Sequence, residues 1–332
     1  MKAIVYYNYG SPDVLKCEEF EKPTPADAEV LIKVRAASLN PADRHLMRRV
    51  PFFIRIVFGL CKPSITQPGR PGRDVAGEVE AVGKNVTQFK PGDAVFGSCL
   101  GACAEYVCAS ESRLVMKPDN VTFEQAASVP VAALTALQGL RDKGQIQPRQ
   151  KVLINGAAGG VGTFAVQIAK SFGADVTGVC STRNVEMVGS IGADRVIDYT
   201  QEDFTKGTQR YDLIFDLVAN HSLLACRRVL NPKGTYIGAG IVGLGESMVG
   251  LLAHMITTIV LPRFVSQNFV TFMAKISKED LAIMRELMEA GKVTPVIDKR
   301  YRLSEVPEAI RYLEEGHARG KVVITLEYNN KT

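Results

Sequence analysis

The sequence lacks the features that mark membrane-spanning, secreted and nucleic-acid-binding proteins. No segment reaches the roughly 18 uninterrupted apolar residues that a membrane span requires. No apolar core with a small-residue cleavage site is present in the first residues, MKAIVYYNYG, which instead predict a strand. The net charge is only +5, whereas binding to nucleic acid needs a clustered basic face. We therefore expect a cytoplasmic protein that does not bind nucleic acid.

A compact cysteine framework is also missing. The seven cysteines are scattered, and an odd number in a chain of 332 residues indicates reduced thiols rather than disulfides. Cys99, Cys103 and Cys108 lie near one another, but no fourth ligand is close and a strand is expected between them. We expect these three side chains to be buried small residues rather than metal ligands.

The length of 332 residues exceeds what a single core usually supports, so we expect two domains. Residues 1–123 contain short apolar runs separated by glycines, which favours a small β-barrel. Residues 124–265 alternate helix with strand, the pattern of a doubly wound α/β domain. We expect the tail, 266–332, to return and complete the first domain.

Hydrophobic periodicity predicts the individual elements. Strands are expected over 2–7, 29–37, 75–82, 94–97, 104–107, 176–180, 195–197, 213–218, 235–239 and 321–326, with another at Val152 and a strand pair near Val296 and Arg302. Helices are expected over 123–139, 185–191, 222–230, 278–290 and 306–315, with a further one beginning at Gly159.

The most informative stretch is KVLINGAAGGVGTFAVQIAKSFG, residues 151–173, which predicts a buried strand, a glycine turn and an amphipathic helix in succession. Gly159 and Gly162 keep the spacing of the dinucleotide-binding pattern G-x-G-x-x-G, with Ala157 in the first place. Because unpaired N–H groups at a helix start favour an anion, we expect a pyrophosphate there. A tight structural turn without a ligand is the alternative. The residues expected to bind the cofactor here are Ala158, Gly159, Gly160, Val161 and Gly162.

Five segments together resemble the medium-chain dehydrogenase/reductases, and most of all their zinc-independent quinone oxidoreductases and alkenal reductases. These segments are PGRDVAGEVEAVGKNVTQFKPGDAVFG, VPVAALTALQGL, INGAAGGVGTFAVQIAK, IGADRVIDYT and GKVVIT, and they occur in the family's order. The resemblance implies an α/β fold with a GroES-like β-barrel catalytic domain, interrupted by a doubly wound Rossmann domain. It also implies a pyridine nucleotide and, in many members, a homodimer.

This chain departs from the zinc-dependent members of the family at each ligand position. Asn40 stands at a cysteine position, and Arg73 and Asp74 stand where a histidine and a glutamate would be. The segment PVAAL lacks a third cysteine, and the four-cysteine structural lobe is missing. Arginine has no lone pair to give a metal, so we expect no metal site.

The expected loss of zinc constrains the chemistry. Oxidising an aliphatic alcohol removes a proton whose pKa is about 16, a step that a bound metal makes possible near neutral pH. Reduction of a quinone or an enone instead leaves a delocalised oxyanion, phenolate-like with a pKa around 10 in the quinone case. The residues therefore favour reduction of an activated carbonyl system.

The expected nucleotide is NADPH. An acidic residue that would bind both ribose hydroxyls of NAD is missing after the second strand of the doubly wound domain, where Ser181, Thr182 and Arg183 stand. Asp175 lies at the wrong end of that strand. Hydroxyl and guanidinium groups favour a phosphate, and the resemblance adds Tyr199 to the pocket. A solvated Arg183 without a ligand is the alternative.

The loop around Asn40, Asp43 and His45 holds the candidate catalytic residues. The resemblance places Asn40 and Asp43 toward the nicotinamide and the substrate, and it has a tyrosine in place of His45. His45 could donate a proton, since its ordinary pKa is about 6.5, or it could be an exposed loop histidine. Asp43 could equally cap the loop. Thr135, Gly240 and Lys321 match family positions near the cofactor, with anchoring of the last strand as the alternative for Lys321.

Two apolar insertions, 50–60 and 248–261, could form a lid for a small hydrophobic electrophilic substrate, or a dimer contact. Beside the first lie Arg48, Arg49, Arg55 and Lys62, which allow a weak membrane-surface contact. We expect an NADPH-dependent, zinc-free reductase of quinones or α,β-unsaturated carbonyl compounds that forms a homodimer. The alternatives are a zinc-independent alcohol dehydrogenase and an NADPH-binding sensor or structural protein with little turnover.

Overall fold

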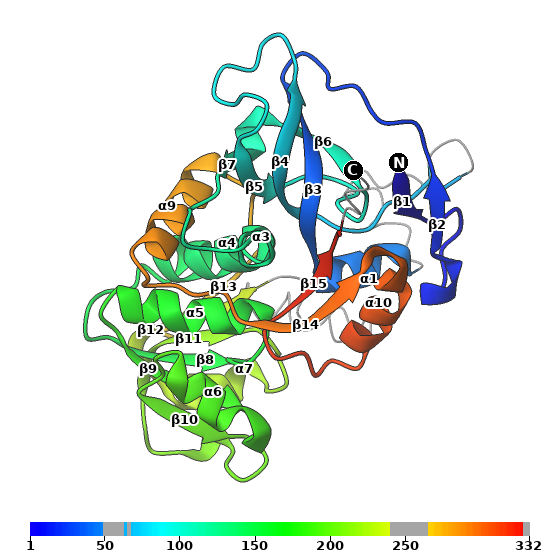
Figure 1. Ribbon diagram of the computed structural model, residues 1–332. Coiled ribbons are helices and arrows are strands. Elements are labelled where there is room, and N and C mark those ends of the chain that lie inside the picture. Colours follow the sequence, from blue (N-terminus) through cyan, green and yellow to red (C-terminus); the bar gives the residue numbers. More distant parts are fainter. Residues whose placement is uncertain (49–62, 65–67, 240–264, 328–332) are drawn as a thin grey trace. The chain divides into compact units, whose positions relative to one another are not determined.

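The computed structural model of the protein describes residues 1–48, 63–64, 68–239 and 265–327 (Figure 1). The chain divides into two compact units. The first unit comprises Met1–Val131, Ile276–Gly291 and Pro295–Thr332, and the second comprises Ala132–Lys275 and Lys292–Thr294. The tail of the chain thus belongs mainly to the first unit.

The first unit is built on a largely antiparallel sheet. Among the described residues this sheet has seven strands on the path β14-β15-β3-β4-β5-β7, with β6 pairing β3, while β1 and β2 form a separate pair. The strands are β1 (Lys2–Val5), β2 (Lys16–Glu19), β3 (Glu29–Leu39), β4 (Asp74–Val82), β5 (Ala94–Ser98), β6 (Tyr106–Ser110), β7 (Leu114–Met116), β14 (Ile297–Arg302) and β15 (Lys321–Thr325). The helices are α1 (Pro41–Met47), α3 (Phe123–Ala127), α9 (Lys278–Glu289) and α10 (Val306–Glu314).

Strand β3 organises the first unit because it pairs with three other strands. Its first half pairs with β6, its last residues pair with β15, and β4 runs along it. Alternate side chains of β3, including Val30, Ile32 and Val34, enter one hydrophobic core, to which α10 contributes Val306 and Ile310. This pairing brings the start of β15 beside the end of β3, where the candidate catalytic residues begin.

The second unit holds a parallel sheet with the doubly wound strand order. Its described strands follow the order β10-β9-β8-β11-β12-β13, which reverses between β8 and β11. The strands are β8 (Lys151–Asn155), β9 (Asp175–Cys180), β10 (Arg195–Asp198), β11 (Tyr211–Asp216), β12 (Leu230–Ala239) and β13 (Asn268–Phe272). The helices are α4 (Pro130–Gln138), which starts in the first unit, α5 (Gly160–Ser171), α6 (Val185–Ser190) and α7 (Leu223–Arg228).

Several sequence-based expectations need correction. The single helix expected over 123–139 is broken into α3 and α4, because Pro130 disfavours a helical conformation at Val129. The strand pair expected near Val296 and Arg302 is one strand, β14. The expected loop of Asn40 and Asp43 is the start of helix α1. Strands β2, β7 and β13 were not expected, and β13 pairs with β12 of the parallel sheet although it lies beyond residue 265.

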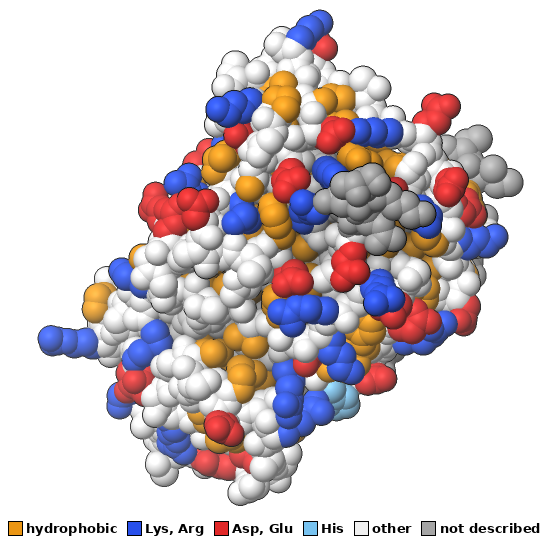
Figure 2. Space-filling view, in the orientation of Figure 1, with side chains coloured by type: hydrophobic (Ala, Val, Ile, Leu, Met, Phe, Trp, Pro, Cys, Tyr) orange, Lys and Arg blue, Asp and Glu red, His pale blue; other side chains and the backbone are white. Residues whose placement is uncertain are grey.

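The helices of the described residues and the charges on the face seen in Figure 2 bear on two of the expected absences. No helix in the described part of the chain is long and apolar enough to cross a bilayer. In Figure 2, lysine and arginine side chains are interspersed with aspartate and glutamate. The absence of a nucleic-acid partner remains an expectation.

Candidate active site

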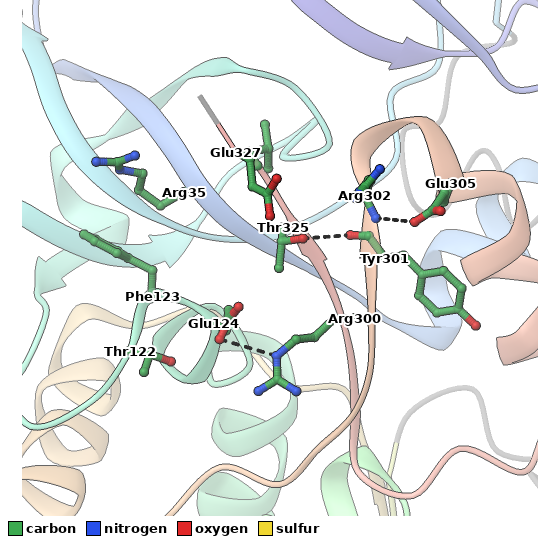
Figure 3. Close-up of a pocket in the computed structure, with 11 residues that line it drawn as sticks. Arg35, Thr122, Phe123, Glu124, Arg300, Tyr301, Arg302, Glu305, Thr325 and Glu327 are labelled. Atoms are coloured by element: carbon green, nitrogen blue, oxygen red, sulfur yellow. Dashed lines mark hydrogen bonds and ion pairs between the residues drawn. The ribbon is translucent and has the colours of Figure 1, made fainter. Parts of the chain in front are cut away.

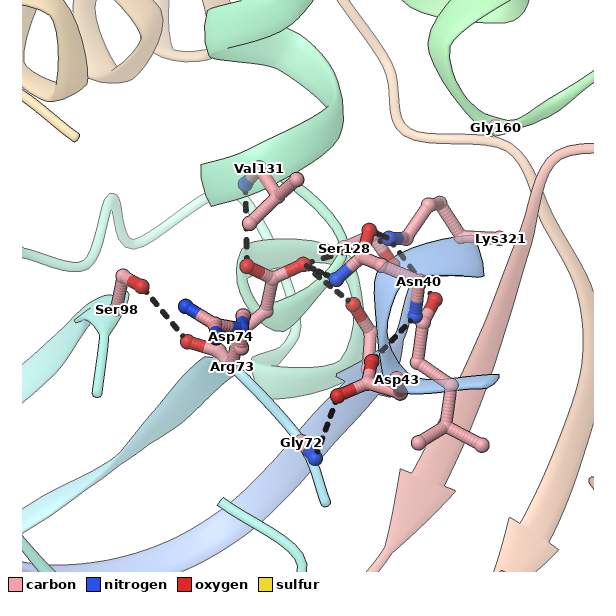
Figure 4. A network of polar contacts seen from close by, with 12 residues as sticks. Asn40, Asp43, Gly72, Arg73, Asp74, Ser98, Ser128, Val131, Gly160 and Lys321 are labelled. Atoms are coloured by element: carbon pink, nitrogen blue, oxygen red, sulfur yellow. Dashed lines mark hydrogen bonds and ion pairs between the residues drawn. The ribbon is translucent and has the colours of Figure 1, made fainter. Parts of the chain in front are cut away.

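A buried polar cluster lies in the first unit where β3 ends and β4 and β15 begin (Figure 4). Its centre is Asp74, the first residue of β4, whose side chain is fully buried. Asp74 Oδ2 accepts hydrogen bonds from Ser38 Oγ and Asn40 Nδ2, each at 2.9 Å. Asp74 Oδ1 accepts a hydrogen bond from the backbone N–H of Val131 at 3.0 Å. With Lys321, the residues Ser38, Asn40 and Asp74 form what we name the Asp74 cluster.

Lys321 supplies the positive charge of the cluster. It is the first residue of β15 and only 3% exposed. Its Nζ donates to Asn40 Oδ1 at 2.7 Å, to the carbonyl oxygen of Leu39 at 3.2 Å and to Asp74 Oδ2 at 3.3 Å. Since an ammonium group carries three protons, the site matches all three with acceptors. These contacts support the anchoring alternative for Lys321; its expected place near a cofactor stays a prediction.

Asp43 stabilises the local backbone. Its Oδ2 accepts a hydrogen bond from the backbone N–H of Asn40 at 2.8 Å, and its Oδ1 accepts one from Gly72 N–H at 2.9 Å. The carboxylate therefore caps the start of α1 and ties it to the segment before β4. Burial raises the pKa of Asp43, and the two backbone hydrogen bonds oppose this shift. The geometry favours the capping role over direct catalysis.

His45 lies on α1 in a setting that favours the neutral imidazole. Its Nε2 is 3.2 Å from a guanidinium nitrogen of Arg44, and because arginine only donates, Nε2 acts as the acceptor. Burial, followed by the charges of Arg44 and Arg48, lowers the pKa of His45. A neutral ring is a poor proton donor near pH 7, so the structure gives little support to the proton-donor alternative.

The described residues offer no metal centre. Within the described part of the chain, no three His, Cys, Asp or Glu side chains are grouped to hold a metal ion. Arg73 is a permanent cation, and the carboxylate of Asp74 is already occupied by its four donors. Cys99 and Cys103 are buried free thiols, and burial raises the pKa of both. These two are buried as expected, whereas Cys108, for which we also expected burial, is only partly buried.

The glycine turn of the second unit joins β8 to α5. Gly156, which the sequence pattern did not single out, makes the sharp turn with φ of +86°. A Cβ on Gly162 would lie 2.1 Å from the carbonyl oxygen of Gly156, so the helix and the turn need glycine there to pack. A Cβ on Gly159 would meet only that oxygen, at 3.4 Å, and its backbone is extended. Glycine at 159 thus leaves space that a ligand phosphate could fill.

The residues expected to distinguish the nucleotide lie together at the carboxyl end of β9. Arg183 belongs to the 3-10 helix Thr182–Asn184 and is exposed. Tyr199 follows β10, is 54% exposed, and donates its backbone N–H to the carbonyl of Cys180 at 3.0 Å. Ser181 Oγ accepts a hydrogen bond from Asn184 Nδ2 at 3.1 Å, which leaves the hydroxyl proton available to a phosphate.

An acidic residue that sequence reasoning missed also lies at this edge. Asp198, the last residue of β10, accepts a hydrogen bond from Thr182 Oγ1 at 2.6 Å. Hydrogen bonds from Thr182 and Thr200 lower the pKa of Asp198, so it is ionised near pH 7. The negative charge of Asp198 would repel a phosphate group bound at this edge of the sheet. The signal was visible in the segment VIDYT, but only strand pairing places Asp198 beside Thr182.

Thr135 lies on α4 and is 8% exposed. Gly240 and the apolar insertions 50–60 and 248–261 lie outside the described residues.

A separate groove of about 660 Å³ opens on the first unit (Figure 3). Arg300 Nε lies 3.4 Å from Glu124 Oε2, and the groove is lined by three arginines and three glutamates. The charged residues that line it are Arg35, Arg300, Arg302, Glu124, Glu305 and Glu327. None of the predicted site residues lines this groove.

Comparison with known families gives two matches. Residues 26–119 match the model described as the alcohol dehydrogenase GroES-like domain. Residues 191–324 match the model described as zinc-binding dehydrogenase.

Known proteins resemble the chain along nearly its whole length. The 2-methylene-furan-3-one reductase of Solanum lycopersicum is 36% identical over 98% of this chain and 79% of that protein. The mitochondrial NAD(P)H oxidoreductase RTN4IP1 of Bos taurus is 36% identical over 98% of this chain and 89% of that protein. The solved structure of the quinone oxidoreductase from Coxiella burnetii matches with a TM-score of 0.85, at 31% identity, and covers 98% and 99% of the two chains.

Proposed function

We propose that this chain, a member of the medium-chain dehydrogenase/reductase superfamily, is an NADPH-dependent reductase that transfers hydride to a quinone or an α,β-unsaturated carbonyl compound. The relatives named above are a furanone reductase, an NAD(P)H oxidoreductase and a quinone oxidoreductase, which supports a nicotinamide cofactor and this class of acceptor.

The observation that carries the proposal is the chemistry of the Asp74 cluster. Asn40 and Arg73 occupy positions where zinc-dependent relatives would bind metal, and neither is a suitable ligand. The carboxylate of Asp74 is neutralised by the ammonium of Lys321 instead. The remaining N–H of Asn40 would be a hydrogen-bond donor to an oxygen that becomes partly negative, which suffices for quinones and enones but not for aliphatic alcohols.

The second unit fits the nucleotide. The N–H groups at the start of α5 and the space at Gly159 suit the pyrophosphate. Ser181, Arg183 and Tyr199 would hold the 2′-phosphate that distinguishes NADPH, against the opposing charge of Asp198. When bound, NADPH supplies the hydride.

In the proposed reaction the acceptor carbon gains the hydride with its electron pair, and the two electrons come from oxidation of the nucleotide. The acceptor oxygen takes the negative charge and accepts a hydrogen bond from Asn40 Nδ2. Water then supplies the proton, because burial and the charges of Arg44 and Arg48 lower the pKa of His45 and disfavour its protonated form.

A panel of quinones, enones and primary alcohols, assayed with NADPH and with NADH, tests the proposal. We expect NADPH oxidation with quinones or enones, no alcohol oxidation, and unchanged activity with a chelator. Activity that requires one zinc per chain would overturn the zinc-free assignment. Tight NADPH binding without turnover of any acceptor would favour the sensor alternative.

Assembly and location are further parts of the proposal. We propose a homodimer, which light scattering coupled to gel filtration would test. We also propose a cytoplasmic location, although one relative is mitochondrial by name. Microscopy of the tagged full-length chain would test it.

A further inference from the structure

The two charged residues of the Asp74 cluster bind the oxygen and the nitrogen of the Asn40 carboxamide, and they also contact each other. Lys321 Nζ contacts the oxygen of the amide at 2.7 Å, and Asp74 Oδ2 contacts its nitrogen at 2.9 Å (Figure 4). An ammonium group can only donate and an ionised carboxylate can only accept. If the amide were reversed, its N–H groups would face the ammonium of Lys321 and its oxygen would face the carboxylate of Asp74, so neither contact could be a hydrogen bond. The chemistry of the partners fixes one orientation.

This orientation leaves one amide hydrogen for a ligand. The nitrogen of Asn40 carries two hydrogens, and in the described part of the chain it makes the one hydrogen bond to Asp74. The bond from Lys321 to the amide oxygen polarises the group and strengthens the N–H groups as donors. Because Asn40, Asp74 and Lys321 are all buried, little water screens this effect.

We propose that Asp74 and Lys321 are positioning residues that fix Asn40 as a polarised N–H donor to the oxygen of the acceptor. The proposal rests on the proposed function, since it assigns Asn40 to the acceptor of that reaction. The positioning proposal goes beyond the proposed function because it gives the Asp74–Lys321 ion pair a role in catalysis, exerted through Asn40 alone. A purely structural ion pair would stabilise the fold without affecting the turnover of folded molecules.

A double-mutant cycle separates these two roles. The cycle compares kcat/KM for a quinone in the wild type, Lys321→Met, Asn40→Ala and the combined variant. Lys321→Met keeps an apolar stem but removes the hydrogen bond that polarises the amide oxygen of Asn40, while Asp74 still accepts from the amide nitrogen. We expect a loss of at least roughly tenfold in kcat/KM for Lys321→Met, and a loss of roughly tenfold to a thousandfold for Asn40→Ala. The combined variant should resemble Asn40→Ala, and multiplicative losses would overturn the proposal.

A second variant covers the case in which Lys321→Met does not fold because it leaves the charge of Asp74 buried and unpaired. Asp74→Asn combined with Lys321→Met leaves no unpaired charge and should fold. This double variant removes both charged partners of the Asn40 amide, so kcat/KM should fall as it does in Lys321→Met. In the Asn40→Ala background the same two substitutions should cause no further loss. Wild-type kcat/KM in this folded variant would overturn the proposal.

The identity of the acceptor gives an additional readout. In a series of para-quinones, the losses for Lys321→Met should grow as the product hydroquinone becomes more basic, because more charge then develops on the oxygen. NADPH affinity, measured by nucleotide fluorescence, should change less than about twofold, since Asn40 donates to the acceptor rather than the nucleotide phosphates. A loss that is equal for all quinones would contradict the proposed donor role.

The matched control is Ser98→Ala. Ser98 is a buried residue of the same unit, and its hydroxyl donates to the carbonyl of Arg73 at 2.9 Å, next to Asp74 but without contact to Asn40. We expect it to lower stability modestly and to leave the dependence on quinone basicity unchanged. If the wild type reduces no quinone or enone, the proposed function fails. If it does and the cycle is multiplicative, only the positioning role fails.

Discussion

The glycine turn of the second unit and the Asp74 cluster of the first unit differ in which parts of the chain would contact a ligand. The turn uses backbone: Gly156 and Gly159 lie between β8 and α5, and Gly162 lies in the first turn of α5. The cluster uses side chains from residues 38, 40, 74 and 321, which only strand pairing brings together. A local motif can therefore be lost by adding one methyl group, whereas the cluster depends on charges that are far apart in the sequence.

The largest effect should come from breaking the ion pair. We expect Lys321→Met to lower the free energy of unfolding by about 3 to 5 kcal/mol, because the carboxylate of Asp74 would remain buried without its cation. Denaturant unfolding measures this loss. Asp74→Asn with Lys321→Met should recover much of it. A single variant as stable as the wild type would contradict the stabilising role of this ion pair.

Cofactor choice should depend on side chains at the end of β9. Arg183→Ala should weaken NADPH binding by about 1.5 to 3 kcal/mol and NADH binding much less, because a charge-assisted phosphate contact is lost. The opposite control is Asp198→Asn, which removes a negative charge beside Thr182 and should tighten NADPH more than NADH. Titration of both nucleotides decides the matter. Equal losses for both nucleotides in Arg183→Ala would leave no role for a 2′-phosphate pocket.

The glycine turn offers a pair of matched substitutions with different consequences. Gly162→Ala should destabilise the fold by about 1 to 3 kcal/mol or more, since its Cβ would lie 2.1 Å from a backbone oxygen. Gly159→Ala should leave the melting temperature of the free protein nearly unchanged and weaken NADPH binding, because its Cβ enters otherwise open space. Thermal melts and nucleotide titrations separate the two. A large loss of stability in Gly159→Ala would favour a tight structural turn without a ligand.

The smallest effect concerns His45 and pH. Its folded pKa is lowered, so below the unfolded pKa of about 6.5 the unfolded state binds a proton that the folded state does not. The stability contributed by neutral His45 is fully present above that pH and falls as the pH decreases. His45→Gln should therefore be less sensitive to acid than the wild type between roughly pH 7.5 and 5. Asp43, whose pKa is raised, is present in both the wild type and His45→Gln, so its contribution cancels when the pH dependence of their stabilities is compared.

Much of the second unit could be predicted from sequence because its signals are local. Strand β8, the turn and helix α5 are adjacent in the chain, and their periodicity identified them within a few residues. Strand β13 was missed because its pairing with β12 spans a long stretch of sequence. In the first unit, the resemblance singled out Asn40, Asp43 and Lys321 one at a time. Capping by Asp43 was the alternative that its residue type offered, whereas nothing in the sequence indicated that Lys321 bonds to Asn40.

The sequence by itself determined the doubly wound strand pattern, the position of the glycine turn and the absence of metal-binding side chains at Asn40 and Arg73. The first two follow from residue type and spacing along the chain, and the third from the family resemblance, which locates the ligand positions. Only the tertiary structure decided that Asp74 and Lys321 form a buried pair around Asn40, and that Asp198 lies beside Thr182. The physical reason is that charge interactions depend on distance and burial, and both are set by the pairing of strands that lie far apart in the sequence.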